Sequence, residues 1–157
     1  MTTSQTNNSL LAAIFQSNSS DNILFQIVWL VVRILASVLM IHNGIDKLED
    51  VPGFAENVVA AIGLPFPILL TYCAAYAEIV GSGLLALGLF TRLSALSLVF
   101  TMLVAIYFHT QIDGFIIAPL ETASLYCLSY LLFFVNGGGL FSVDTIIKKM
   151  FAPNADQ

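Results

Sequence analysis

Charged residues are scarce in this sequence. Asp, Glu, Lys and Arg together make up only 10% of its 157 residues, whereas hydrophobic residues make up 58%. A soluble domain carries roughly 25% charged residues, because its surface faces water on every side. The few charges of this chain cannot cover such a surface, so lipid must cover part of it. The composition therefore predicts an integral membrane protein with the length of a single domain.

Basic residues are the scarcest charges. Five Lys and Arg stand against ten Asp and Glu, which gives a formal net charge of −5. Nucleic acid is bound by clustered Lys and Arg, and a polybasic membrane anchor needs the same residues. The sequence has no such cluster, so neither is expected. No Lys or Arg precedes Arg33, so a cleavable signal peptide, which has a positive segment ahead of its apolar run, is not expected either.

Cysteines and catalytic motifs are also sparse. Cys73 and Cys127 form no CxxC pair and lie inside apolar segments, a position typical of cysteines that only pack. The sequence contains no HExxH, no nucleophile elbow and no complete phosphate-binding glycine loop. Metal binding and nucleophilic catalysis are therefore not predicted.

Long apolar runs are what the sequence has in abundance. A helix needs about 20 mainly apolar residues to cross ~30 Å of hydrocarbon. Four runs meet or approach that length: 23–41, 68–90, 93–109 and 119–139. Only Thr91 and Arg92 separate the second run from the third, so these two form an antiparallel hairpin. The predicted fold class is all-α, an integral membrane four-helix transmembrane bundle.

The segments outside the runs have their own patterns. The chain divides into a polar N-terminal tail, a transmembrane domain and a C-terminal tail over residues 1–22, 23–146 and 147–157. In the acidic loop over 44–67, apolar residues recur at helical spacing at Phe54, Val58, Val59 and Ile62. This spacing predicts a short amphipathic helix lying on the membrane, and Pro65 and Pro67 end it before the second span.

The segment after the fourth span predicts a helix end and a new helix. Three successive glycines, 137–139, tolerate the left-handed backbone that ends a helix. Ser142 then offers an N-cap for a short C-terminal helix that carries Lys148 and Lys149.

The basic residues predict the orientation in the membrane. With four spans, both termini lie on one side. A cytoplasmic position for the termini puts Arg92, Lys148 and Lys149 inside and only Lys47 outside, as the positive-inside rule favours. We therefore expect both termini in the cytoplasm.

Two charged residues interrupt the apolar runs. Arg33 is about halfway along the first run and Glu78 about halfway along the second. An unpaired charge at the bilayer centre costs about 3 kcal/mol or more, so the simplest expectation is that Arg33 and Glu78 pair with each other. Two interpretations stay open: an ion pair that fixes helix register, and a buried binding or proton-handling site. Small residues around Glu78, such as Thr71, Ala75 and Ser82, indicate a face turned towards other helices.

A second group of polar residues lies where spans end. His42 and Asn43 follow the first run, His109 closes the third and Glu121 opens the fourth. In the predicted topology they come to one membrane face. Such residues can exchange protons, donate a hydrogen bond to a quinone carbonyl, or bind a metal, although no ligand spacing supports a metal. The alternative is that the histidines only bond to loop carbonyls at the interface.

These elements together resemble the DoxX family of small bacterial membrane proteins. The resemblance covers roughly residues 25–146. It rests on Arg33, the segments 42–48 (HNGIDKL), 63–65 (GLP), 78–81 (EIVG) and 88–92 (GLFTR), Glu121 with Tyr126, and the glycine run before 142–144 (SVD).

The resemblance implies a four-helix bundle in a bacterial inner membrane. The family is named for a subunit of a membrane thiosulfate:quinone oxidoreductase, and other members are associated with oxidative-stress and sulfur-handling complexes. We therefore expect a subunit or accessory of a quinone-linked redox or stress complex, with no independent enzymatic activity and quinone as its cofactor. Its partners would be membrane lipid and other redox proteins, and such a bundle is compatible with oligomers. The alternatives are a small transporter or lipid-binding bundle, with an anion held by Arg33, and a purely structural scaffold.

Overall fold

The computed structural model describes residue 17 and residues 20–112 and 114–151. Most of the polar tail expected over 1–22, and the last part of the C-terminal tail, lie outside the described residues. All the regular elements of the described part of the chain are helices, which confirms the all-α prediction.

Four of these helices are long and apolar enough to cross a membrane. They are α2 (Ile23–Glu49), α4 (Pro67–Leu87), α5 (Thr91–Gln111) and α6 (Ile117–Asn136). The last three agree closely with the predicted runs. The first run was predicted to end at 41, whereas α2 continues without a break to Glu49. Hydropathy marks where apolar residues stop, and α2 stays helical after that point through polar residues.

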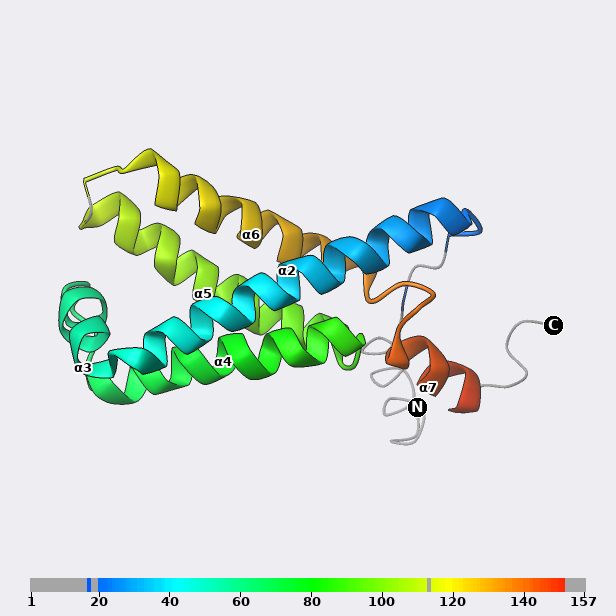
Figure 1. The fold of residues 1–157 in the computed structure, drawn as a ribbon, viewed down its shortest axis with the longest axis horizontal. Helices are drawn as coiled ribbons and strands as arrows, with labels where there is room; N and C mark the ends of the chain where they lie inside the picture. The colour runs from blue at the N-terminus through cyan, green and yellow to red at the C-terminus, as the bar shows by residue number, and fades with distance from the viewer. Residues whose placement is uncertain (1–16, 18–19, 113, 152–157) are drawn as a thin grey trace, which may run out of the picture.

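The spans are arranged as two antiparallel helix pairs. α2 packs along α4, and α5 packs along α6, while the tight turn at Gly88–Phe90 joins the two pairs. Figure 1 shows the pairs meeting near α7 (Val143–Phe151) and diverging towards α3, where α2 and α6 no longer lie side by side. We call these two ends of the bundle the α7 end and the η1 end.

The α2–α4 pair is closely packed because Gly44 has no side chain. A Cβ added to Gly44 would lie 3.0 Å from the carbonyl oxygen of Ala75 and 3.2 Å from Cβ of Glu78. Small residues at such crossings allow helices to approach closely in lipid. Thr71, Ala75 and Ser82 on α4 are buried, so the inward face predicted around Glu78 is confirmed.

The loop between α2 and α4 is helical, as its apolar spacing predicted. It consists of the single turn α3 (Val51–Phe54) and a π-helix, η1 (Ala55–Ala60). The carboxylate of Asp50 caps α3 by accepting from the backbone N–H of Gly53 at 3.0 Å. The segment packs against α4 at the η1 end (Figure 1).

At the α7 end, a loop rich in glycine closes the bundle. Gly137 and Gly139 have positive φ and end α6 as predicted. The hydroxyl of Ser142 accepts from the backbone N–H of Thr145 at 3.2 Å, which confirms the predicted N-cap of α7.

Candidate functional site

Arg33 and Glu78 do not pair, and this expectation was wrong. The guanidinium of Arg33 donates from Nη1 to the carbonyl of Gly138, and from Nη2 to the carbonyl of Phe141 at 2.6 Å. Glu78 instead pairs with Lys47. The two buried charges therefore belong to two polar clusters, one at the α7 end and one towards the η1 end.

Side-chain direction explains this pairing. The Cα–Cβ bonds of a helix tilt towards its N-terminus. On α2 that direction is the α7 end, so Arg33 leans towards the glycine loop and away from Glu78. Glu78 lies on the antiparallel α4 and leans towards the η1 end. Lys47 lies near that end of α2 and leans back towards the α7 end, so the two side chains meet. Arg33 and Lys47 are 14 residues apart, which is about 21 Å along a helix axis at ~1.5 Å per residue.

The Arg33 cluster holds together the α7 end of the bundle. The carboxylate of Asp144 accepts from the backbone N–H groups of Phe90 and Thr91, both at 2.8 Å. Trp29 donates from Nε1 to the carbonyl of Gly137 at 3.1 Å. Backbone groups at the ends of α5 and α6 are thus satisfied by side chains, and Arg33 is only 1% exposed. We interpret this cluster as structural.

The Lys47–Glu78 pair forms the polar part of a different environment. Nζ of Lys47 lies 2.6 Å from Oε2 of Glu78 and donates a longer bond, 3.3 Å, to the carbonyl of Asn43. It also lies 5.3 Å from the centre of the Phe54 ring, within the range of a cation–π interaction. The side chain of Glu78 is only 2% exposed and that of Lys47 16%, so the pair is largely shielded from solvent.

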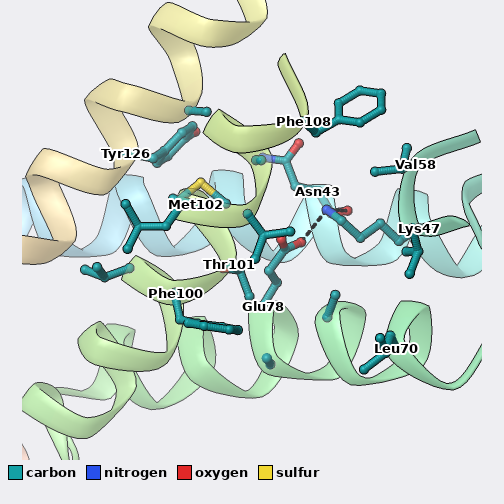
Figure 2. A pocket seen from close by; sticks show the side chains of 18 of the residues that line it. Asn43, Lys47, Val58, Leu70, Glu78, Phe100, Thr101, Met102, Phe108 and Tyr126 are labelled. Carbon is teal, nitrogen blue, oxygen red and sulfur yellow. Dashed lines mark hydrogen bonds and ion pairs between the residues drawn. The ribbon is translucent and has the colours of Figure 1, made fainter. Parts of the chain in front are cut away.

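This pair lies in the wall of a cavity of about 1180 Å³. The cavity fills the space where the two helix pairs diverge, and its wall is mostly apolar. Figure 2 shows Glu78 and Lys47 pointing towards each other, with Asn43 and Thr101 beside them and Tyr126 across the cavity. The apolar side of the short helical segment, Phe54, Val58, Val59 and Ile62, also faces the cavity. The pattern that predicted an amphipathic helix on the membrane thus marks a lid segment over this space.

The polar groups of the wall are few and come from all four spans. They are Asn43, Lys47, Cys73, Glu78, Ser97, Thr101, His109, Thr122 and Tyr126. Pockets for small molecules typically combine a mainly apolar lining with a small number of such groups. Their volume is usually ~300–1,000 Å³, so this cavity has room for a molecule with a long apolar tail.

The residues predicted to gather at one face share the η1 end but do not form one site. His109 lines the cavity. His42 is exposed, and its Nε2 lies 3.6 Å from the carboxylate of Asp46, one helical turn away on α2. Glu121 is exposed and does not line the cavity. Within the described residues, no group of three or more His, Cys, Asp or Glu is placed to hold a metal ion.

Sequence reasoning missed Lys47 as a candidate, although the signal was present. Lys47 lies four residues after Asn43 and three after Gly44, on the helix face that packs against α4. Placing the end of the first span at 41 moved Lys47 into a loop and left Glu78 without its nearest cation. Extension of the helical spacing past the apolar run would have identified the pair.

Comparison with known proteins places the chain in a family. The DoxX family model matches residues 28–111, which include most of α2 and all of α3, η1, α4 and α5 and amount to more than half of the chain. Two proteins of Haemophilus influenzae, both described as uncharacterized, are similar in sequence. One is 35% identical over 122 residues, covering 74% of this chain and 88% of the relative; the other is 28% identical over 130 residues, covering 78% and 84%. No solved structure was found to match. The chain therefore belongs to the DoxX family and is a multi-pass membrane protein.

Proposed function

We propose that the cavity binds a membrane-soluble molecule with a polar head and an apolar tail, and that this molecule is a quinone used by a membrane redox complex. The observation that carries the proposal is the position of the Lys47–Glu78 pair in the wall of a large, mainly apolar cavity between transmembrane helices. The choice of a quinone rests in addition on the family resemblance.

Hydrogen-bonding capacity supports a head group with carbonyl oxygens. A Lys ammonium has three N–H donors, and Lys47 uses them on Glu78 and on the carbonyl of Asn43. One donor of Lys47 therefore remains for a ligand. Among the described residues, the side-chain amide of Asn43 makes a single long contact, 4.0 Å, to Sδ of Met40. A quinone carbonyl accepts hydrogen bonds from donors of this kind.

Charge balance supports a neutral ligand. Lys47 and Glu78 compensate each other, so the cavity wall carries no net charge from this pair. A charged ligand would have to disrupt the pair or be buried without a counter-ion, and both are costly. A neutral ring can lie beside the pair without either penalty, and its tail can fill the apolar part of the cavity.

The redox role belongs to the complex in this proposal. The chain holds the quinone, and a partner protein in the same membrane exchanges electrons with it. Lys47 and Asn43 orient the head group, while the apolar wall and the lid segment exclude water. We propose that the complex lies in a bacterial inner membrane.

The experiment is to identify what co-purifies with the cavity. The protein is extracted with its native lipids in polymer discs, and bound quinones and lipids are quantified by mass spectrometry. Ala105 lines the cavity on α5, so Ala105→Trp fills part of it. Leu128 is 59% exposed on α6 and outside the cavity wall, so Leu128→Trp is the control for a bulky residue facing lipid.

We expect about one quinone per chain in the wild type and in Leu128→Trp, and several-fold less in Ala105→Trp. Quinone present only in the ratio of the surrounding membrane, and unchanged by Ala105→Trp, would contradict the proposal.

A second candidate function is transport or binding of a lipid-like anion. The ammonium of Lys47 favours it, because the remaining donor suits a phosphate or carboxylate as well as a carbonyl. Arg33 does not suit this role, since it already donates to two carbonyls of the glycine loop. Enrichment of one phospholipid in the same extraction, with its uptake by liposomes that contain the pure protein, would favour this second function.

We also propose the orientation of the bundle. Among the described basic residues that flank the spans, Arg92 lies in the first turn of α5 and Lys148 and Lys149 lie in α7, so all three are at the α7 end. Lys47 lies in the last turn of α2, towards the η1 end. The positive-inside rule therefore favours a cytoplasmic α7 end, and the cavity then lies towards the outer half of the membrane.

A further inference from the structure

The short C-terminal helix α7 has a surface that the four-span bundle does not cover. Ile146 is 58% exposed and Met150 73% exposed, and they lie four residues apart on the same side of the helix. Val143 and Ile147 flank them and are half-buried. Lys148 and Lys149 are both exposed. At ~100° per residue, Lys148 lies opposite the apolar side, and Lys149 borders that side, ~60° from Ile146 around the helix axis. The helix is therefore amphipathic, with its apolar side turned outward.

The position of α7 is fixed by hydrogen bonds to the α4–α5 turn. The backbone N–H of Asp144 donates to the carbonyl of Gly88 at 2.9 Å, and its carboxylate holds the N–H groups of Phe90 and Thr91. That turn connects two membrane spans, so it marks one boundary of the hydrocarbon. Since α7 is attached there through its buried first turn, it lies at this boundary.

The charges at this end of the molecule are mainly positive. Among the described residues, four basic side chains lie at the α7 end: Arg33 on the glycine loop, Arg92 at the start of α5, and Lys148 and Lys149 in α7. The described acidic residues there are Asp21, just before α2, and Asp144, and the carboxylate of Asp144 is occupied by the N-terminus of α5. Lys148 and Lys149 are thus the exposed charges of α7, and they complement an anionic surface.

We propose that α7 is an interfacial helix that inserts Ile146 and Met150 into the bilayer boundary and binds anionic phospholipid headgroups through Lys148 and Lys149. Helices with an apolar face and Lys on the polar face bind membranes in this way, and each Lys near an anionic leaflet adds to the attraction. The inference does not depend on the ligand of the cavity. Neither the cavity nor the Arg33 cluster requires α7 to be amphipathic, and the proposal gives its apolar side a role.

The first test measures the depth of the apolar side of α7 in the full-length protein. Cys73→Ala and Cys127→Ala remove the native thiols, and a single cysteine is placed by Ile146→Cys or Lys148→Cys, ~160° apart around the helix, and labelled with a small fluorophore. The protein is reconstituted in phosphatidylcholine vesicles that contain phosphatidylglycerol. Lipids brominated on the upper acyl chain quench labels in the bilayer boundary, and iodide quenches labels in water.

We expect brominated lipid to quench the label at 146 and iodide to quench the label at 148. Equal quenching of both labels by iodide would overturn the proposal. Protection of the label at 146 from both quenchers would also overturn it, because a protein surface, from a partner or a second copy, would then cover α7.

The second test needs no cysteine substitution, so it stays decisive if the thiol-free protein does not fold. Binding of spin-labelled phosphatidylglycerol and phosphatidylcholine is compared for the wild type and for Lys148→Gln with Lys149→Gln. Both lysines are exposed, so the variant should fold normally. We expect the preference for phosphatidylglycerol to fall about fivefold or more, with phosphatidylcholine binding unchanged. An unchanged preference would overturn the role of the two lysines.

Discussion

Nζ of Lys47 lies 2.6 Å from Oε2 of Glu78, and this ion pair joins α2 to α4 at the wall of the cavity. A pair in this position has two consequences. It supplies the buried Glu78 with a counter-charge, and it leaves the cavity with a polar region that has no net charge. Both the stability of this region and the proposed ligand binding therefore depend on Lys47 and Glu78 acting together.

The first prediction tests the pair itself. Glu78→Gln or Lys47→Met leaves one buried charge without its partner, which should lower the free energy of unfolding by about 3–5 kcal/mol. Lys47→Met combined with Glu78→Leu removes both charges and should recover much of that loss. Thermal unfolding in detergent measures each variant. The control is the cycle of Arg33→Met with Glu78→Gln, whose losses should add within ~0.5 kcal/mol because the two residues share no partner. Strong coupling in the control cycle would contradict the two separate clusters.

The second prediction concerns the close approach of α2 and α4. Gly44→Ala adds a Cβ that would lie 2.7 Å from Cγ1 of Ile79 and 3.0 Å from the carbonyl oxygen of Ala75, so the helices must move apart. We expect a loss of about 1–3 kcal/mol in unfolding free energy. Gly83→Ala is the matched control, because nothing lies within 4 Å of its added Cβ. There the better helix propensity of Ala should stabilise the protein slightly. Equal effects of the two substitutions would mean that α2 and α4 are not packed as described.

The third prediction separates cavity residues from other residues at the same end. Asn43→Leu removes a donor from the cavity wall and should weaken ligand binding by up to about tenfold, the usual value of one hydrogen bond. His42→Leu and Glu121→Gln should leave the affinity unchanged, because both side chains are exposed and neither lines the cavity. Binding is measured with the ligand identified by co-purification. A loss of affinity in His42→Leu equal to that in Asn43→Leu would show that the boundary of the site is drawn wrongly.

The fourth prediction concerns orientation. Three of the basic residues that flank the spans lie at the α7 end: Arg92 in the first turn of α5, and Lys148 and Lys149 in α7. A reporter enzyme fused after Gln157 should therefore be active in the cytoplasm, and a tag inserted next to Glu56 should be accessible from outside. Digestion of the C-terminal reporter by protease added to intact cells would show the opposite orientation.

Much of the fold could be predicted because the membrane restricts the choices. Long apolar runs form helices when backbone groups cannot bond to water. The tight link at Thr91 then predicts that the second and third runs lie next to each other. The end of α2 could not be read in the same way. Residues 42–49 are polar enough to resemble a loop, yet they continue α2 and contact α4 through Gly44 and Lys47.

The site was predicted in part for the same reason. Glu78 was correctly expected to be buried among small residues, and His109 was correctly placed at the end of its span. The partner of Glu78 was assigned by depth along an apolar run, which measures Cα positions. A long side chain such as that of Arg33 extends several ångströms towards the helix N-terminus, so its charge lies at a different depth. The divergence of the two helix pairs leaves no mark in the sequence, because the apolar residues that line the cavity look like those that face lipid.

The most direct measurement of the central claim is a titration of the delipidated protein with a short-tailed benzoquinone, followed by thermal unfolding. A ligand that binds only the folded state at 100 times its Kd stabilises it by about 2.7 kcal/mol. We expect a saturable rise in Tm for the wild type and for Leu128→Trp, and a clearly smaller rise at the same quinone concentration for Ala105→Trp, in which part of the cavity is filled. No rise in the wild type, or the same rise in all three proteins, would contradict a quinone site at Lys47 and Glu78.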